Sequence, residues 1–185
     1  LWSSDGRFLR ELGAEWTTNR PRGLDVAANG DYWIADTGGV RVLQADAEGR
    51  LIRQIGGPED ELGPGQPTDV ALSPGGLLFV VEPIAALLWK VDPEGGRRER
   101  FAGPQANTIE SPHLAIAADG RVVLTDPEGG RVLVLTPDAR PLAQFGTRGT
   151  EPGQFGRPVG VALTADGAIV VSDPDLCRVT MVSGW

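Results

Sequence analysis

Short runs of apolar and β-branched residues recur along the chain, and turns containing glycine or aspartate separate them. The run Asp31–Ala35 contains Tyr, Trp and Ile, which favour strands, and it follows the tight-turn pair Asn29-Gly30. Four such runs follow one another within one stretch of the chain, at residues 23–27, 31–35, 40–45 and 50–55. This pattern predicts four antiparallel strands joined by hairpins.

The same order of runs and turns recurs four times. The copies begin near prolines (Pro21, Pro67, Pro112 and Pro158), and the turn glycines Gly30, Gly76, Gly120 and Gly167 are 46, 44 and 47 residues apart. A period near 45 residues with several short strands per repeat is typical of a β-propeller, with one blade per repeat. We therefore expect one all-β domain over residues 1–185, with blades of four antiparallel strands at 21–56, 67–103, 112–146 and 158–184.

The first and last repeats are incomplete at complementary places. A turn at Ser3–Gly6 and a strand-like run at Arg7–Leu12 come before the first repeat, and the last repeat has three strand-like runs before Trp185. We expect segment 7–12 to pair near Arg178–Val182 and complete the last blade, because an unpaired edge strand invites aggregation. The alternative is a fragment of a larger ring. The chain begins at Leu1 rather than Met, which favours an excised or processed piece, natural or engineered.

These repeats resemble the NHL repeat. Gly153–Leu163 followed by Asp166-Gly167 is similar to the family's Gly-Gln-Phe, Pro and Gly-Val-Ala pattern, and Trp33–Asp36 with Arg41-Val42 is similar to its second strand and the residues after it. The resemblance covers nearly the whole chain and implies a propeller, which in this family usually has six blades. It also implies an interaction platform, often attached to a catalytic or membrane partner in bacteria. Some propellers of this broader type are metal-dependent lactonases, or lyases that use several histidines.

Charge and composition narrow the range of partners. The net charge is −8 and the pI is near 4.7, which disfavours binding to nucleic acid. No apolar run is close to the length of about 18 residues that a membrane-spanning helix needs. A single cysteine, Cys177, excludes an intramolecular disulfide and leaves the compartment open. Only one of the 17 basic residues is lysine, a bias that favours a bacterial source.

Aspartate ends the second strand of three repeats, and arginine follows five residues later. A carboxylate and a guanidinium across a tight turn form a strong pair, so we expect three structural clips, namely Asp36–Arg41, Asp126–Arg131 and Asp173–Arg178. The second repeat departs from this pattern, because Glu82 and Leu87 occupy the two positions. Its loop, Glu82–Ala86, is more apolar, and it is either a contact patch or a repacked loop.

Polar residues that differ between repeats are the candidates for function, and they gather at the start of the first strand. One position holds Gly23, Asp69, His113 and Gly160 in the four repeats. The candidate ligand-binding residues are Arg22, Asp25, Thr68, Asp69 and His113. They either form a small polar site at the mouth of the propeller channel, for a protein or a small ligand, or hydrogen-bond to loop backbone.

A single histidine makes a zinc site of several histidines impossible within one chain. Asp69 and His113 are an acid–base pair that the repeats place in neighbouring blades. We expect no catalytic residue, no metal and no cofactor, and the leading hypothesis is a non-catalytic binding or scaffold domain. The alternatives are a metal-dependent lactonase-like or lyase-like propeller, and a purely architectural repeat piece.

Overall fold

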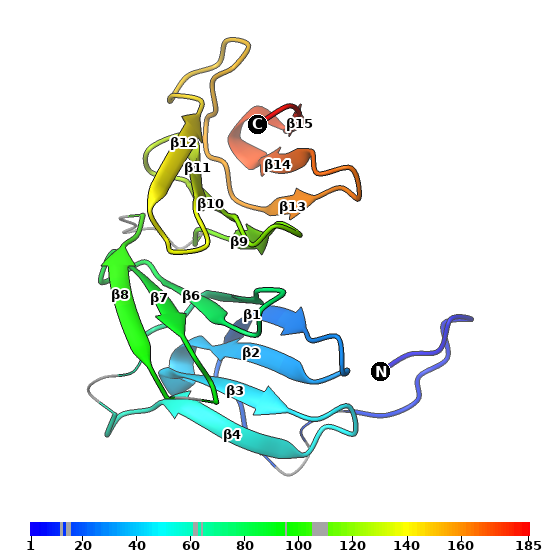
Figure 1. Ribbon diagram of the computed structural model, residues 1–185. Coiled ribbons are helices and arrows are strands. Elements are labelled where there is room, and N and C mark those ends of the chain that lie inside the picture. Colours follow the sequence, from blue (N-terminus) through cyan, green and yellow to red (C-terminus); the bar gives the residue numbers. More distant parts are fainter. Residues whose placement is uncertain (12, 14–15, 61–62, 64, 95, 105–110) are drawn as a thin grey trace.

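The computed structural model describes residues 1–11, 13, 16–60, 63, 65–94, 96–104 and 111–185. In these ranges, fifteen β-strands form four antiparallel sheets (Figure 1). Strand order within each sheet follows the sequence, so every strand pairs with its neighbour in the chain. Consecutive antiparallel strands need only tight turns, which the glycine-containing turns of the sequence supply.

Three sheets have four strands and the last has three. The first contains β1 (Pro21–Val26), β2 (Tyr32–Asp36), β3 (Arg41–Ala45) and β4 (Leu51–Gly56). The second contains β5 (Asp69–Leu72), β6 (Leu78–Glu82), β7 (Leu87–Val91) and β8 (Arg98–Ala102). The third contains β9 (Leu114–Ile116), β10 (Val122–Asp126), β11 (Arg131–Leu135) and β12 (Pro141–Phe145). The fourth contains β13 (Val161–Leu163), β14 (Ile169–Asp173) and β15 (Arg178–Val182); short 3₁₀ helices follow β2 and β14, at η1 (Thr37–Gly39) and η2 (Pro174–Leu176).

The sheets are propeller blades arranged side by side in an open arc (Figure 1). The first strands of neighbouring blades are in contact in the order β1, β5, β9 and β13. These four strands line the inner side of the arc, and β4, β8 and β12 lie on its outer side. No helix in the described ranges is long and apolar enough to cross a membrane.

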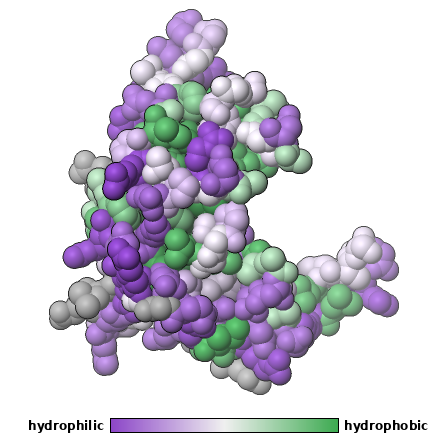
Figure 2. All heavy atoms as spheres, viewed as in Figure 1, coloured by the Kyte–Doolittle hydropathy of each residue, from purple (hydrophilic) through white to green (hydrophobic). Residues whose placement is uncertain are grey.

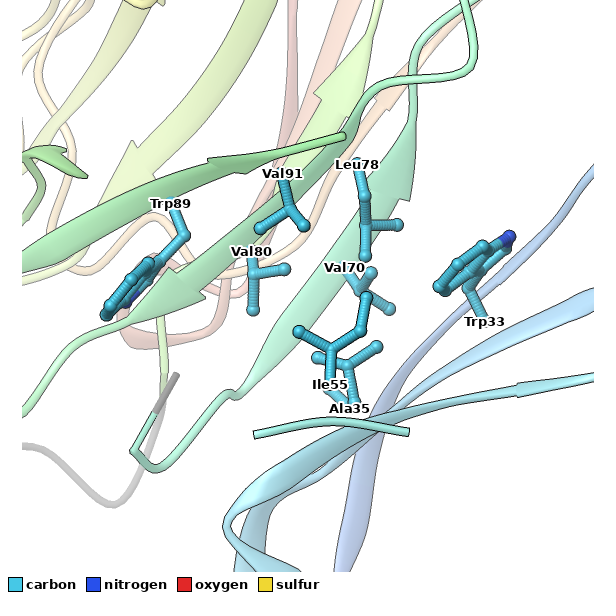
Figure 3. Packing of buried hydrophobic residues seen from close by; sticks show 9 residues of the cluster. Trp33, Ala35, Ile55, Val70, Leu78, Val80, Trp89 and Val91 are labelled. Carbon is cyan, nitrogen blue, oxygen red and sulfur yellow. The ribbon is translucent and has the colours of Figure 1, made fainter. Parts of the chain in front are cut away.

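The hydrophobic core lies between the blades. Successive side chains of a strand point to opposite faces of the sheet. The side chains of β6 therefore pack alternately against the first and the third blade. Leu78 and Val80 pack against the first blade, in the cluster with Trp33 shown in Figure 3, whereas Phe79 and Val81 pack against the third blade. All five residues of β6 and of β10 are buried. The continuous apolar runs of the sequence therefore belong to strands covered on both faces.

The N-terminal segment lies elsewhere than the sequence predicts. The expected pairing of segment 7–12 with Arg178–Val182 is not formed by the described residues 7–11, because the fourth sheet ends at β15. Instead, Phe8 pairs with Trp2. The two rings meet edge to face with centroids 5.4 Å apart. The Arg10 guanidinium donates a hydrogen bond to the Ala47 carbonyl, at 3.0 Å. These contacts hold the segment on the first blade, at the other end of the arc from β15 (Figure 1).

The three repeated aspartates are almost fully buried, and each lies beside its arginine. The distance from the arginine Nε to a carboxylate oxygen is 2.9 Å for Arg41–Asp36, 2.8 Å for Arg131–Asp126 and 4.0 Å for Arg178–Asp173. The aspartates also accept backbone hydrogen bonds, which the sequence pattern did not show. Asp36 accepts the Asn19 N–H at 2.6 Å, and Asp173 accepts the N–H groups of Gly156 and Arg157, both at 2.9 Å. In these two blades the carboxylate ties the chain that leads into the blade to the turn after its second strand.

The second blade keeps this tie with different side chains. Glu82 is buried and accepts a hydrogen bond from the Trp89 indole N–H at 2.7 Å. Its other oxygen accepts the Gln66 N–H at 3.4 Å. An indole thus replaces the guanidinium of the other blades, and the loop is repacked around Glu82. The tip of the loop, Ile84, is 69% exposed and so also presents an apolar contact surface.

The residue that precedes the third strand has left-handed backbone in every blade. Its φ is 58° at Val40, 53° at Ala86, 62° at Gly130 and 48° at Cys177. Only one of the four is glycine, although this region is unfavourable for residues with a Cβ atom. The turn geometry is therefore set by the blade rather than by the residue at its tip.

Candidate functional site

A cavity of about 830 Å³ lies on the inner side of the arc. It is lined by β1, β5, β9 and part of β13 together with the turns that follow the first three strands. Figure 2 shows the molecule hollowed on the side where these strands lie. Four of the five candidate residues of the sequence line this cavity: Arg22, Asp25, Asp69 and His113.

Strand pairing places Gly23, Asp69, His113 and Gly160 at equivalent positions. Gly23 pairs with Ala35 of β2, and Asp69 pairs with Val81 of β6. Ala35 and Val81 each come directly before the acidic residue that ends their strand. In the other two blades, the N–H groups at this point of β10 and β14 donate to the carbonyls of His113 and Gly160, both at 2.9 Å. These four residues thus form one tier across the blades at one end of the cavity.

Asp69 is at the centre of this tier. Its Oδ2 lies 3.1 Å from the His113 Nδ1 and accepts the Leu114 N–H at 2.9 Å. A carboxylate only accepts hydrogen bonds, so this contact requires the proton of a neutral His113 on Nδ1. The other ring nitrogen, Nε2, has no hydrogen-bond partner among the described residues. It therefore carries the lone pair of neutral imidazole, on a side chain that is 35% exposed and lines the cavity.

The neighbours of Asp69 hold it in place. Gly23 packs so closely that a Cβ atom there would lie 2.3 Å from Asp69 Oδ1 and 2.5 Å from its Cα. His113 is anchored through its backbone, because its N–H donates to Thr125 Oγ1 at 2.8 Å. The same hydroxyl donates to the Val159 carbonyl at 2.7 Å and so joins the third and fourth blades. Both members of the pair are fixed before any ligand arrives.

The hydrogen bond to Asp69 raises the pKa of His113 above its ordinary value of 6.5, and the charge of Asp69 adds to this effect. Burial and the nearby Arg22 guanidinium act in the opposite direction. A raised folded-state pKa means that the pair stabilises the fold fully below about pH 6.5 and loses this contribution as the pH rises through the folded pKa.

We therefore expect the melting temperature of the wild type to exceed that of His113→Gln by the largest margin near pH 5, and by a smaller margin above the folded pKa. Thermal unfolding of both proteins from about pH 5 to about pH 9 measures this difference. A margin that stays constant, or that grows with pH, would contradict the raised pKa of His113.

Three other polar side chains complete the picture of this region. The Arg22 guanidinium donates to Ser111 Oγ at 2.8 Å, and Arg22 lines the cavity beside His113. Asp25 accepts the Leu72 N–H at 2.7 Å and its neighbour Val26 N–H at 2.8 Å. Thr68, the fifth candidate, is buried outside the cavity lining, and its N–H donates to the Val81 carbonyl.

The described residues contain no group of three or more His, Cys, Asp or Glu side chains placed to hold a metal ion. Cys177 is exposed, at the end of η2.

Sequence reasoning missed two residues of this region. Ser111 precedes the third repeat, and Thr125 occupies a strand position where the other blades have Ala35, Val81 and Ser172. Ser111 belongs to no repeated polar position. Thr125 matches Ser172 of the fourth blade, whose hydroxyl accepts the Gly160 N–H at 3.0 Å, so the signal that could have found Thr125 is a hydroxyl shared by two blades at a position where the other two have Ala35 and Val81. The close contact of Gly23 with Asp69 depends on how neighbouring blades pack, which the repeat pattern does not specify.

Known proteins share this architecture. A streptogramin B lyase structure superposes with a TM-score of 0.71 at 17% identity, covering 94% of this chain and 58% of that one. A gluconolactonase from Xanthomonas campestris superposes with a TM-score of 0.67 at 21% identity, covering 89% of this chain and 58% of that one. The protein is a β-propeller.

One curated protein is similar to this propeller in sequence. A probable peptidyl-alpha-hydroxyglycine alpha-amidating lyase from Caenorhabditis elegans is 28% identical in an alignment of 145 positions that covers 70% of this chain and 40% of the relative. No protein-family model matches the chain. The chain thus spans less than two thirds of the length of this relative and of the two enzymes above.

Proposed function

We propose that the propeller binds a small organic molecule in the inner cavity and that His113 exchanges a proton with it, as part of a lyase-like or lactonase-like enzyme. The observation that carries this proposal is the Asp69–His113 pair: Nδ1 contacts Asp69, Nε2 has no hydrogen-bond partner among the described residues, and the His113 side chain lines a cavity of about 830 Å³. An orienting carboxylate, a histidine and an adjacent cavity are the elements of a general acid–base site. The similarity to a lyase in sequence, and to a lyase and a lactonase in fold, supports the same class.

We also infer that the repeats are of the NHL type. The motif Gly153–Leu163, the turn Asp166-Gly167 and the strand Trp33–Asp36 support this assignment, together with the antiparallel four-stranded blades. In this arrangement the first strands of the blades, with Asp69 and His113, lie on the inner side of the arc.

The pair can serve an elimination that needs no strong base. With Nδ1–H donating to Asp69, the Nε2 lone pair accepts the proton of a substrate hydroxyl, and the buried carboxylate stabilises the imidazolium that forms. In an α-hydroxyglycine, the O–H electron pair becomes the new C=O bond, the C–N bond breaks, and the amide nitrogen takes back the proton from Nε2. The products are a carboxylic acid with an aldehyde group and a peptide amide, and the histidine is regenerated.

The test is turnover of a peptidyl-α-hydroxyglycine, with a gluconolactone and a streptogramin B as alternative substrates, followed by mass spectrometry of the products. We expect His113→Gln to lower kcat about 100-fold or more, because it removes the proton acceptor, and Asp69→Asn to lower it because the ring loses its orientation. Glu94→Gln is the matched control, since Glu94 is 80% exposed and lies on the second blade away from the cavity lining. Equal turnover by wild type and His113→Gln would refute the role of His113.

A non-catalytic binding domain is the second candidate function. Asp25 and Asp69 both accept backbone hydrogen bonds from a neighbouring blade, which gives each carboxylate a structural role independent of catalysis. The chain also has a single histidine, so one imidazole would have to act both as the base and as the acid of a reaction. Binding of a substrate analogue without any product from the three substrates would favour this role.

A further inference from the structure

The segment before the first blade resembles the outermost strand of a blade. Residues 6–13 (Gly-Arg-Phe-Leu-Arg-Glu-Leu-Gly) align without a gap with residues 49–56 (Gly-Arg-Leu-Ile-Arg-Gln-Ile-Gly), which contain β4. The glycines at the two ends have φ of 78° in the first segment, and of 88° and 86° in the second. Segment 6–13 thus has the sequence of an outer strand and the same left-handed backbone at both ends.

Segment 6–13 also lies on the first blade as an outer strand lies on the next blade. The Arg10 guanidinium donates to the Ala47 carbonyl, in the turn before β4. At the equivalent place, the Arg53 guanidinium of β4 donates to the Pro93 carbonyl, in the turn before β8. No strand of a blade pairs with the described residues 7–11. The first blade therefore holds an outer strand to which the described residues add no inner strands.

The turn after this segment repeats a contact that joins the third and fourth blades. A Cβ atom built at Gly13 would overlap the Trp16 ring, and one built at Gly146, after β12, would overlap the Phe155 ring. Phe155 is almost fully buried and belongs to the core between the third and fourth blades. Trp16 therefore has, beside the first blade, the place that Phe155 has in a complete contact between two blades.

Each end of the arc presents an apolar blade face that is covered in the other blades. Leu24 of the first blade is 59% exposed, whereas Val70 and Leu114, at its position in the next two blades, are 2% and 6% exposed. Val179 of the fourth blade is 69% exposed, whereas the residues at its position in the other three blades are at most 1% exposed, namely Val42, Leu88 and Val132. The first blade thus lacks a neighbour on one side, and the fourth blade lacks one on the other.

The open face of the fourth blade has a groove of about 500 Å³, which Ser172, Cys177 and Val179 help to line. Ser172 has the position of Thr125, whose hydroxyl donates to the Val159 carbonyl where the chain enters the fourth blade. A hydroxyl group and an apolar wall therefore lie together on the fourth blade as they do where the third blade receives the next segment of the chain.

We propose that a second copy of this chain covers the open face of the fourth blade and completes its sheet. Segment 7–12 of the second copy pairs with β15, and its Trp16 and Leu24 pack on Val179 and Met181. An added strand satisfies the unpaired N–H and C=O groups of an exposed edge strand, and the apolar faces gain hydrophobic free energy when they are covered. The contact repeats the one between the third and fourth blades, and it does not depend on the proposed function.

Sedimentation equilibrium from about 1 μM to about 1 mM protein tests the proposal. We expect a dimer, because two copies joined at both ends form a ring of eight blades, which is within the range of known propellers. Val179→Asp should weaken dimerisation at least about 100-fold, since the contact would bury an unpaired charge. Ile84→Asp is the matched control, because Ile84 is also 69% exposed but lies in a loop of the second blade. A monomer at all concentrations, or a dimer that Val179→Asp leaves unchanged, would overturn the proposal.

An engineered disulfide tests the strand pairing itself. In the first blade Leu43 lies opposite Gln54, and the same register places Thr180 of one copy opposite Glu11 of the other. The Cα atoms of directly opposite residues are about 4.5–5.5 Å apart, a distance that a disulfide can bridge. With Cys177→Ser to remove the native thiol, Glu11→Cys combined with Thr180→Cys should give a disulfide-linked dimer on oxidation.

The matched control combines Gln54→Cys with Thr180→Cys in the same background. Gln54 already belongs to a complete blade, so this variant should stay unlinked on a non-reducing gel. A disulfide within one chain in the Glu11→Cys variant would show that the chain closes on itself and would overturn the role of the second copy. Equal amounts of linked dimer in the two variants, or none in either, would also overturn it.

Discussion

Replacing Asp36 by alanine is expected to lower the free energy of unfolding by about 3–5 kcal/mol, because buried charge-assisted hydrogen bonds lose their acceptor. The Asp36 side chain is fully buried and accepts from Arg41 Nε at 2.9 Å and from the Asn19 N–H at 2.6 Å. Without the carboxylate, the segment that leads into β1 loses its tie to the turn after β2. Chemical denaturation with a two-state fit measures the change.

The control is a pair whose acidic partner is exposed. Glu94 is 80% exposed and lies 2.7 Å from Arg53, so Glu94→Ala should cost less than about 1 kcal/mol. If Asp36→Ala and Glu94→Ala destabilise the protein equally, the buried carboxylate does not have the stabilising role assigned to it.

Replacing Gly23 by alanine is expected to lower the free energy of unfolding by about 1–3 kcal/mol, the usual cost of an added group in a filled interior. The new Cβ would meet Asp69 Oδ1 at 2.3 Å and its Cα at 2.5 Å. The second of these atoms belongs to the backbone, so a side-chain rotation cannot relieve the overlap. The inner strands of the first two blades must separate, and the Asp69 carboxylate, which lies between Gly23 and His113, must change the geometry of its contact with His113.

The Gly23 variant should therefore also lose the pH-dependent part of the stability that His113 supplies. Gly75→Ala is the matched control, because no atom lies within 4 Å of a Cβ built at Gly75. Denaturation at about pH 5 and about pH 9 compares the two variants. A Gly23→Ala protein with wild-type stability at both values would show that the two blades are free to move apart at this point.

Most of the fold could be predicted from the repeat pattern, because strands and turns depend on residues that are close together in the sequence. Turn pairs such as Asn29-Gly30 and the alternation within β6 depend only on neighbouring residues and on burial of both faces, so the strands follow from the sequence. The course of segment 7–12 does not. Its pattern fits a fourth strand, but Phe8 and Arg10 find partners on the first blade, and such a choice between distant edges has no local signal.

The residues of the candidate site were likewise predictable from the sequence only in part. Asp69 and His113 were identifiable because they interrupt a position that is glycine in the other two repeats. Their contact was not, because it depends on how two blades pack. Thr68 was selected by the same criterion, yet it is buried behind the inner surface. Difference between repeats thus identifies unusual positions, and only the packing of blades decides which of them face the cavity.

The left-handed turn at Cys177 has a practical consequence. This thiol is the single one in the sequence and it is exposed on the fourth blade, whereas Trp33 lies in the core between the first two blades. A maleimide dye therefore attaches at one known point without any engineered cysteine. In a variant that keeps Trp33 as its only tryptophan, energy transfer from this indole to the dye would report how far the two ends of the arc move apart or together when a ligand enters between them.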